Sequence, residues 1–298
     1  MEPFVSVVMT IYNGQSYLKE SISSILKQNY QNFEFIIVND GSSDQSDKIV
    51  LSFSDKRIKY YQFKENKGVI NRLNFAFEKA NGVYVVKMDQ DDISKFDRIE
   101  KQVNFMESHF DVGVCGSFVR LFGAQNGIWK MPTTNDEIKA ALINGSTFCH
   151  PSVIFRKQVL IDNKIKYSHG FNLTDDYELW TQLFSVTKFA NLNIPLLHYR
   201  ISEEQVSFKR KKEQDQQIQV LRKRLLDAVH EISDSEFNQI FNLQKSHTNY
   251  DKLKIESIIS VINQFSIKNS QYGIFNKAAF KKELGYNLLS IFVLNDQI

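Results

Sequence analysis

Three carboxylates stand within four positions at the end of one apolar stretch. The stretch Val83–Met88 is followed by Asp89, Gln90, Asp91 and Asp92. Such a stretch is typical of a buried strand, and unpaired carboxylates are costly in a core, so we expect the acids to emerge where the strand ends. Parallel α/β sheets bind ligands there, and a D-x-D could hold a divalent cation and the phosphates it bridges. A solvated acidic turn before a helix is the alternative interpretation of an isolated D-x-D.

A second polar group follows an earlier apolar stretch. Asn39-Asp40-Gly41-Ser42 stands where a strand is predicted to turn into a helix. Gly41 permits a left-handed turn, and Asp40 would project as an acceptor for an imide N–H or a ribose hydroxyl. An ordinary turn with a helix cap is the alternative. The first apolar stretch likewise ends in Thr10-Ile11-Tyr12-Asn13, which offers an aromatic face at the same sheet edge.

A parallel sheet would bring these residues to one edge, and the first hundred residues alternate strand and helix signals in the rhythm of such a sheet. Strands are predicted over Phe4–Thr10, Phe33–Val38, Ile58–Phe63 and Val83–Met88. Helices are predicted over Tyr17–Lys27, from a cap at Ser43 or Asp44 to Leu51, and over Val69–Ala80. This pattern predicts a nucleotide-binding α/β half.

The alternation loosens beyond residue 97. Helices are predicted over Arg98–His109 and Asp175–Val186, strands over Val112–Phe122 and Ser152–Phe155, and a loop over Gly123–Pro132. From Gln205 to His230 the chain is polar and basic with helical spacing of its apolar residues, and amphipathic helices are predicted from there to the end. We expect a helical appendage after the α/β part.

Composition argues against several classes of protein. The 298 residues are 42% hydrophobic and 24% charged, as in ordinary globular proteins, and a net charge of +3 gives no support for a nucleic-acid partner. Cys115 and Cys149 are too few for a disulfide framework and lack metal-site spacing, which favours a reducing cytoplasm. No apolar stretch approaches the roughly 20 residues of a spanning helix, and no secretory leader is expected. Neither G-x-G-x-x-G after the first strand nor G-x-x-x-x-G-K-[ST] occurs, which argues against Rossmann dehydrogenases and P-loop enzymes.

In order and spacing, the motifs over roughly residues 4–207 resemble those of the family 2 glycosyltransferases of the GT-A fold. Five of them lie in the first half: Thr10-Ile11-Tyr12-Asn13, Asn39-Asp40-Gly41-Ser42, Asn66-Lys67-Gly68, Met88-Asp89-Gln90-Asp91-Asp92 and Arg98-Ile99-Glu100-Lys101-Gln102. Three follow: His150-Pro151-Ser152-Val153, Asp175-Asp176-Tyr177-Glu178-Leu179-Trp180 and His198-Tyr199-Arg200. Several ordered motifs argue strongly against chance agreement.

The resemblance implies a role for each matching residue. It assigns nucleotide-sugar binding to Thr10, Tyr12, Asp40, Lys67, Arg72 and Asp89. Within this set Asp40 would take the uracil imide proton. Asp91 would hold Mn²⁺ or Mg²⁺ against the diphosphate. The chain departs from the common Ala-Arg-Asn around Arg72, because Leu73 follows that arginine.

The resemblance also implies a catalytic base in the helix predicted from Asp175. The family usually has Glu-Asp here, and its second carboxylate is the usual base, which points to Asp176. Because Asp175 replaces the Glu, Asp175 and Glu178 are rival candidates, and an acidic turn complementing the helix macrodipole is the structural alternative. Contacts to acceptor or diphosphate are expected from further residues, each with a structural role as the alternative: His150, Trp180, His198 and Arg200.

The implied function is an inverting, metal-dependent transfer of one hexose or N-acetylhexosamine. The donor would be a UDP-sugar, and the product a β linkage to a hydroxyl of a surface glycan. The motifs are similar to those of bacterial capsule and O-antigen enzymes, so the acceptor is expected to carry a polyprenyl diphosphate. A GT-A domain is predicted over residues 1–204, with a nucleotide-sugar half at 1–97 and an acceptor half at 98–204, before a helical region at 205–298.

Two alternative functions stay open. A sugar-phosphate nucleotidyltransferase shares the sheet but usually opens with a glycine-rich loop, which is lacking after Thr10. A non-catalytic sugar-nucleotide-binding or scaffold protein of a glycan assembly complex is the other. We expect a cytoplasmic location. The basic run Lys209–Lys212 and the apolar segment Tyr286–Leu294 predict peripheral contact with the inner face of the cell membrane, with a solvated helix face as the alternative.

Overall fold

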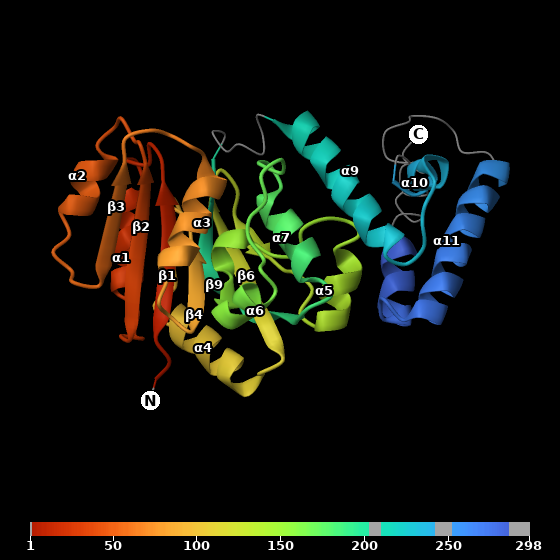
Figure 1. The fold of residues 1–298 in the computed structure, drawn as a ribbon, viewed down its shortest axis with the longest axis horizontal. Helices are drawn as coiled ribbons and strands as arrows, with labels where there is room; N and C mark the ends of the chain where they lie inside the picture. The colour runs from red at the N-terminus through yellow and green to blue at the C-terminus, as the bar shows by residue number, and fades with distance from the viewer. Residues whose placement is uncertain (1, 203–209, 242–251, 286–298) are drawn as a thin grey trace.

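The computed structural model describes residues 2–202, 210–241 and 252–285. These residues form one nine-stranded sheet in the order β3-β2-β1-β4-β8-β6-β9-β5, with β7 paired to β6. Figure 1 shows the strands side by side, flanked by helices, with the C-terminal helices gathered at one end. The α/β architecture with helices after it, expected from the sequence, is confirmed.

The first half of the sheet is parallel. Its strands are β1 (Val5–Ile11), β2 (Phe33–Asp40), β3 (Ile58–Phe63) and β4 (Tyr84–Met88). The pairs β1–β2, β2–β3 and β1–β4 are all parallel, so the four carboxyl ends meet at one edge. The helices of this half are α1 (Leu18–Leu26), α2 (Ser46–Leu51) and α3 (Val69–Lys79).

Alternation along β1 explains which helix covers which face. Val8 belongs to the core cluster that includes Leu73 of α3, whereas Val7 and Met9 belong to the cluster that includes Ile22 of α1. Successive side chains of a strand point to opposite faces, so β1 is buried on both sides. Figure 1 shows α3 in front of the parallel strands. Burial of such a side chain stabilises the fold by about 1.5–3 kcal/mol, which holds the strand ends rigidly.

The second half of the sheet is mixed. Its strands are β5 (Ile93–Ser94), β6 (Val112–Gly123), β7 (Gly127–Trp129), β8 (Ile154–Arg156) and β9 (Lys188–Ile201). β8 is antiparallel to both β4 and β6, and β6 is parallel to β9. The helices are α4 (Arg98–Ser108), α5 (Asn135–Ala141), the 3₁₀ helix η1 (His150–Ser152), α6 (Lys157–Asp162) and α7 (Asp175–Leu183).

A buried polar network at the start of α4 joins the two halves. Arg98 is fully buried and donates from Nη2 to the Lys87 carbonyl at 2.9 Å and from Nε to Gln102 Oε1 at 3.0 Å. Gln102 Nε2 in turn donates to the carbonyls of Cys115 and Ser152, at 3.1 and 2.8 Å. Burial lowers the pKa of Arg98 to about 10. The Arg98–Gln102 motif therefore ties β4 to β6 and η1.

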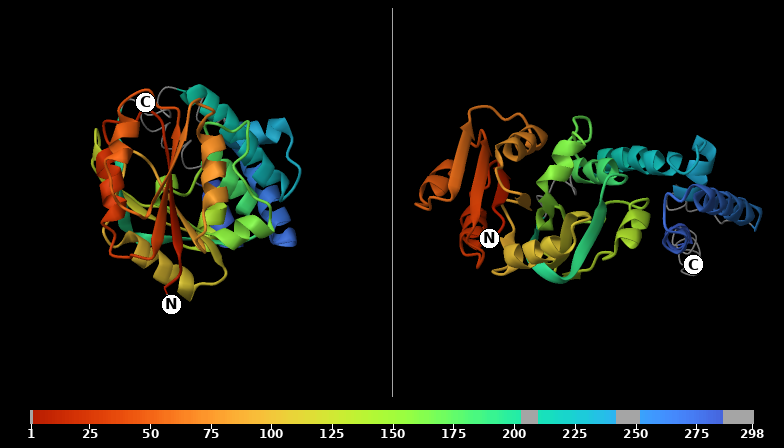
Figure 2. Two further views of the ribbon diagram at one scale, coloured as in Figure 1. Left: turned by 60° about the vertical axis from the view of Figure 1, so that its left-hand side comes forward. Right: turned by 60° about the horizontal axis from the view of Figure 1, so that its bottom comes forward.

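The C-terminal helices continue the core of the α/β part. They are α9 (Lys211–Asp227), α10 (Asp234–Phe241), α11 (Lys252–Tyr272) and a helix over residues 277–285. Leu221 and Leu225 of α9 share a core cluster with Leu179 and Trp180 of α7. Figures 1 and 2 show α10 and α11 at the end of the molecule opposite β3. In the described part of the chain, no helix has both the length and the hydrophobicity needed to cross a membrane.

Three local predictions are wrong. Residues 123–132, predicted as a loop, contain β7, where Trp129 pairs with Val119 of β6. The helix predicted from a cap at Ser43 or Asp44 begins at Ser46. No strand is predicted over residues 188–201, where the structure has β9 with His198 and Arg200. Most other boundaries shift by a few residues.

Part of the predicted membrane contact cannot be placed in this fold. Lys209 and the segment Tyr286–Leu294 lie outside the described residues.

Candidate functional site

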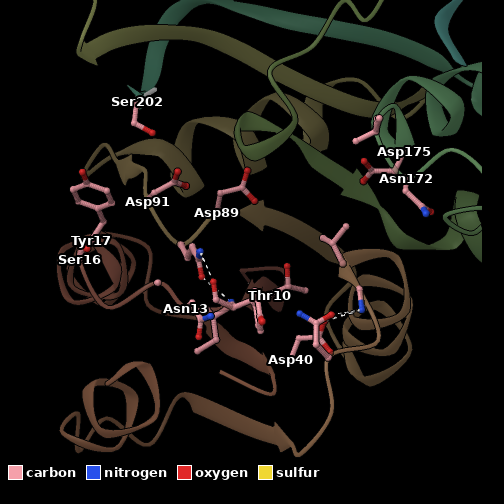
Figure 3. A pocket seen from close by; sticks show the side chains of 18 of the residues that line it. Thr10, Asn13, Ser16, Tyr17, Asp40, Asp89, Asp91, Asn172, Asp175 and Ser202 are labelled. Atoms are coloured by element: carbon pink, nitrogen blue, oxygen red, sulfur yellow. Dashed lines mark hydrogen bonds between the residues drawn. The ribbon is translucent and has the colours of Figure 1, made fainter. Parts of the chain in front are cut away.

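A cavity of about 610 Å³ opens at the carboxyl ends of β1, β2 and β4. Figure 3 shows Asp40 on one side of it, with Asp89 and Asp91 next to each other and Asp175 on a further wall. Several of the predicted site residues line this cavity together: Thr10, Tyr12, Asp40, Asp89, Asp91 and Asp175. The parallel strands bring the first five to one edge, and α7 adds the last.

Asp40 ends β2 and is almost fully buried in the cavity wall. Its Oδ1 accepts hydrogen bonds from Arg72 Nε at 2.5 Å and from the Lys67 backbone N–H at 2.9 Å. Its Oδ2 accepts from the Gly68 backbone N–H at 2.8 Å. An ionised carboxylate has about four acceptor positions, so one on Oδ2 is left for a ligand. Gly68 has φ +88°, which favours glycine at the start of α3.

Lys67 and Arg72 support Asp40 and do not themselves line the cavity. The Arg72 guanidinium is buried, lies 3.7 Å from the ring centre of Phe63 and donates to the Glu65 carbonyl at 2.7 Å. The Lys67 side chain is 62% exposed, with Nζ 4.0 Å from Glu65. The positive charge of Arg72, which lies outside the cavity lining, therefore balances the negative charge of Asp40.

Gln90, between the two D-x-D carboxylates, holds the loop that follows β1. Its Oε1 accepts from the Tyr12 backbone N–H at 2.9 Å, and its Nε2 donates to the Tyr12 carbonyl at 3.2 Å. A Cβ atom at Gly14 would lie 2.4 Å from Gln90 Oε1, so a larger residue there would displace the Gln90 side chain from Tyr12. These bonds hold the backbone of Tyr12, whose half-exposed ring lines the cavity.

The two D-x-D carboxylates have different surroundings. The ammonium of Lys87, which is almost completely buried, forms an ion pair with Asp89. Burial opposes the ionisation of Asp89, but Lys87 outweighs it and lowers the pKa of that carboxyl. In the described chain no other residue donates a hydrogen bond to the Asp91 carboxylate, and burial together with the charge of Asp89 raises its pKa to about 6. Asp91 is therefore the carboxylate that an added cation would stabilise most.

Asp92 is buried, which corrects the expectation that all three acids emerge at the strand end. Its Oδ1 accepts from the Arg200 backbone N–H at 2.9 Å, while Oδ2 has no partner within the described residues. The Arg200 guanidinium lies between the rings of Tyr17 and Phe122 and donates from Nε to the Asp91 carbonyl at 2.8 Å. Arg200 therefore fixes the D-x-D backbone to β9.

Two carboxylates begin α7. Asp176 Oδ2 accepts from the Ser146 hydroxyl at 3.0 Å, and Ser146 Oγ accepts from Trp180 Nε1 at 3.1 Å. Trp180 is fully buried and stacks on Phe155, so its role is in the core, where it orients the hydroxyl that holds Asp176. Burial raises the pKa of Asp176, and burial with the charge of Asp176 raises the pKa of Asp175 to about 7. This pair can take up a proton near neutral pH.

His150 is partly buried and does not line the cavity. Its Nε2 lies 2.8 Å from the Tyr167 hydroxyl oxygen. Burial, assisted by the charge of Lys87, lowers the pKa of His150 to about 3, so its ring is neutral.

The side chains of Glu178 and His198 do not line the cavity and make contacts in other parts of the fold. Glu178 accepts from Gln182 Nε2 at 2.6 Å and forms an ion pair of 3.3 Å with Arg224, so it connects α7 to α9. The His198 ring packs near that of Phe122, at 6.2 Å between centres. Six predicted contact or base candidates are absent from the cavity lining of the described chain, among them the predicted base: Asp176, His150, Glu178, Trp180, His198 and Arg200.

Sequence reasoning missed the residues that close the cavity opposite the parallel strands. These are Asn172, Leu173, Tyr199, Ser202 and Gln214. Gln214 lies on α9 and donates from Nε2 to the Leu173 carbonyl at 2.9 Å. Tyr199 stood within a recognised motif, whereas the other four belong to no motif and are identified only by their position in space.

Comparison with known proteins agrees with this geometry. Residues 6–163 match the family described as Glycosyl transferase family 2. An uncharacterized glycosyltransferase of Haemophilus influenzae is 34% identical over 218 residues, which cover 69% of this chain and 68% of that protein.

Two solved structures share the fold. Residues 1–349 of S. aureus TarS, in complex with UDP, align with a TM-score of 0.64 at 18% identity, covering 97% of this chain and 88% of the other. The mannosyltransferase PcManGT from Pyrobaculum calidifontis, in complex with GDP-Man and Mn²⁺, gives 0.59 at 14% identity, covering 97% and 86%. These similarities concern the fold, and the expected GT-A fold is confirmed.

Proposed function

Because the chain belongs to glycosyl transferase family 2 and is therefore a transferase enzyme, we propose that it moves one sugar from a UDP-sugar to a hydroxyl of a lipid-linked surface glycan. We further propose that the transfer is metal-dependent, inverts the anomeric carbon and forms a β linkage. The observation that carries this proposal is that Asp40, Asp89, Asp91 and Asp175 line one cavity.

Two features support a UDP-sugar as the donor. The acceptor position left on Asp40 suits the N3–H of uracil, which is a donor. TarS, which shares the fold, has been solved with UDP and with UDP-GlcNAc. The donor would then extend from Asp40 towards the D-x-D, with Thr10 and Tyr12 beside the base.

Mn²⁺ or Mg²⁺ fits the residues at the D-x-D. In the described chain no three His, Cys, Asp or Glu side chains are grouped to hold a metal ion. Asp91 would therefore be the protein ligand and the donor diphosphate would contribute others, as is common for cations bound through one or two carboxylates. PcManGT has been solved with Mn²⁺. When bound, the cation would neutralise charge on the departing diphosphate.

The carboxylates of α7 are suited to activate the acceptor. In a direct displacement, the acceptor oxygen bonds to the anomeric carbon while the bond to the diphosphate breaks, and the configuration inverts. The hydroxyl proton must pass to a base on the face opposite the diphosphate. We assign that base to Asp176, because Ser146 orients its carboxylate and burial raises its pKa. Asp175 is its rival on the cavity wall, and Glu178 is occupied by Arg224.

The acceptor is proposed from the resemblance to capsule and O-antigen enzymes. A polyprenyl diphosphate anchors its glycan in the bilayer, so the protein would contact the inner face of the cell membrane peripherally. Family membership favours glycosyl transfer over the nucleotidyltransferase alternative and over a non-catalytic binder.

A donor screen tests the proposal. Sugar nucleotides are ranked by thermal stabilisation of the protein with Mn²⁺ or EDTA, and the best is assayed for release of UDP. We expect a UDP-sugar to stabilise the protein in Mn²⁺ and to be turned over slowly to UDP. Stabilisation without release of UDP, even when glycan acceptors are supplied, would favour a non-catalytic binder, and release of pyrophosphate from UTP and a sugar phosphate would indicate a nucleotidyltransferase.

A further inference from the structure

A second cavity, of about 690 Å³, lies between α3 and α6 and shares no lining residue with the first. Most of its wall is apolar: Phe75, Phe77, Leu160, Ile161, Ile165, Tyr167 and Leu179. Ile161 is 53% exposed at this wall. Concave apolar surfaces with a few polar groups at the edge are typical of ligand sites. We call this second cavity the α3–α6 groove.

The edge of the α3–α6 groove is positively charged. Lys157, Lys164 and Lys166 line it. The Lys157 ammonium donates to the Ala80 carbonyl, and none of the three lysines forms an ion pair with a described carboxylate. Its acidic lining residue, Glu78, has the ammonium of Lys79 4.0 Å away. Positive charge beside an apolar wall is complementary to an anionic group attached to a hydrocarbon chain.

Helix α3 runs along both cavities. Gly68 and Val69 at its start line the first cavity, and Asn71 and Asn74, within the next turns, line the groove. Because a helix rises about 1.5 Å per residue, the two linings come within roughly one turn of each other.

Tyr167 provides a second connection. It lines the α3–α6 groove, while its hydroxyl lies 2.8 Å from Nε2 of the partly buried His150, which interacts electrostatically with Asp89 of the first cavity. Its backbone N–H donates to Asn74 Oδ1 at 3.0 Å, and its carbonyl accepts from Asn74 Nδ2 at 2.9 Å. The wall between the two cavities is therefore held in place by hydrogen bonds.

We propose that the α3–α6 groove binds the prenyl diphosphate part of the lipid-linked acceptor. The hydrocarbon chain would lie on Phe75, Phe77 and Ile161, and the diphosphate would contact Lys164 and Lys166. The inference rests on the proposed function, because it names the place where that acceptor's lipid part binds. The glycan attached to the diphosphate would then extend past Tyr167 to the first cavity.

Calorimetric titration with farnesyl diphosphate, below its micelle concentration and in EDTA with saturating UDP, tests the groove. UDP blocks the nucleotide subsite, and EDTA removes any cation that could hold a diphosphate at Asp91. We expect binding that is at least about tenfold tighter than for farnesol or for inorganic pyrophosphate, because each alone uses half of the site. Pyrophosphate or farnesol binding as tightly as farnesyl diphosphate would overturn the proposal.

Substitutions in the α3–α6 groove then test whether farnesyl diphosphate binds there. Ile161→Glu places a carboxylate on the apolar wall and Lys166→Glu reverses a charge at the edge, so each should weaken farnesyl diphosphate at least about tenfold. Leu51→Glu and Lys59→Glu make the same changes at exposed positions that line neither cavity, and should leave the affinity unchanged. If Ile161→Glu does not fold, the exposed Lys166→Glu carries the test. Equal affinity in parent and Lys166→Glu would reject the groove.

Release of UDP from the donor in the absence of acceptor separates the two proposals. Failure of the parent protein to turn over any UDP-sugar would reject the proposed function, even if farnesyl diphosphate binds. Turnover of a UDP-sugar without binding of farnesyl diphosphate would reject the groove alone.

Discussion

Lys87 and Asp89 form an ion pair at the end of β4, with the lysine side chain 2% exposed and the aspartate side chain 36% exposed. The sheet interior therefore supplies the counter-charge for one carboxylate of the D-x-D. Asp91 lines the same cavity without an ion-pair partner among the described residues.

Replacing Lys87 by Met should weaken donor binding and lower stability, because it leaves Asp89 without its counter-charge. Loss of one partner of a fully buried pair lowers the free energy of unfolding by about 3–5 kcal/mol. Because Asp89 is partly exposed, we expect a loss of about 2 kcal/mol here. Urea unfolding and donor titration measure the two effects. Lys101→Met, which removes an exposed pair with Asp97, is the control and should change stability by less than about 0.5 kcal/mol. Parental donor affinity in Lys87→Met would contradict this role.

Asp91→Asn should abolish turnover and make UDP affinity nearly independent of Mn²⁺. The amide removes the charge that Asp91 would offer to a cation. Calorimetric titration of UDP in Mn²⁺ and in EDTA checks this, with the parent protein as reference. Equal UDP affinity of variant and parent in Mn²⁺ would rule out Asp91 as the ligand.

Asp176→Asn should lower kcat at least about a hundredfold while leaving UDP-sugar affinity nearly unchanged, because the base acts on the acceptor hydroxyl. Initial rates and donor titration separate the two effects. Asp175→Asn and Glu178→Gln are the controls on neighbouring carboxylates. Near-parental turnover in Asp176→Asn together with an inactive Asp175→Asn would show that Asp175, and not Asp176, is the base.

The rate should fall as the pH is lowered. Burial raises the pKa of Asp176 and, with the charge of Asp176, raises that of Asp175 to about 7. A base acts only when ionised, so kcat should fall as the pH drops through the raised pKa of the Asp175–Asp176 pair, and it should reach a plateau above that pKa.

Ser146→Ala should move this acid limb to higher pH, because the Ser146 hydrogen bond stabilises the ionised Asp176. A shift of up to about one pH unit is expected, since such a bond is worth about 0.5–1.5 kcal/mol. The profile of kcat against pH measures it, and Ser108→Ala, at the exposed end of α4, is the control. An unshifted limb in Ser146→Ala would mean that Asp176 does not set it.

UDP should bind more tightly than CDP or GDP. Cytosine has a ring acceptor where uracil has N3–H, so CDP leaves the remaining acceptor position of Asp40 without a donor. Guanine is larger than uracil, so GDP would not fit the base pocket in the same way. A hydrogen bond to a charged group is worth about 1.5–3 kcal/mol, which predicts a preference over CDP of roughly 10- to 150-fold. Competition calorimetry would show it. CDP binding as tightly as UDP would contradict the proposal that Asp40 accepts a hydrogen bond from the uracil N3–H.

The parallel half could be predicted because its local signals agree. Ile58–Phe63 is a strand as expected, and the apolar stretches before Asp40 and Asp89 place those acids at strand ends. Buried parallel strands read as continuous apolar runs, so their ends are visible in the sequence.

Side-chain direction and long-range partners could not be predicted. Nothing in Asp91-Asp92 indicates that one carboxylate faces the cavity while the other is covered by the backbone of Arg200. Lys87 lies in an apolar stretch, and its partner depends on the turn at the strand end. Gln214 enters the cavity wall from α9 through packing between distant segments.

That contribution of α9 bears on how enzymes of this kind could diversify. Gln214 and Gln217 hold the segment of Leu173 and Thr174 from outside the predicted catalytic domain. An exchange of the chain beyond residue 204 between two homologous genes would therefore replace part of the wall opposite the D-x-D and leave the Asp40 pocket intact. Under the proposed function, recombination at that boundary would alter the acceptor side of the cavity while the proposed base pocket is inherited unchanged.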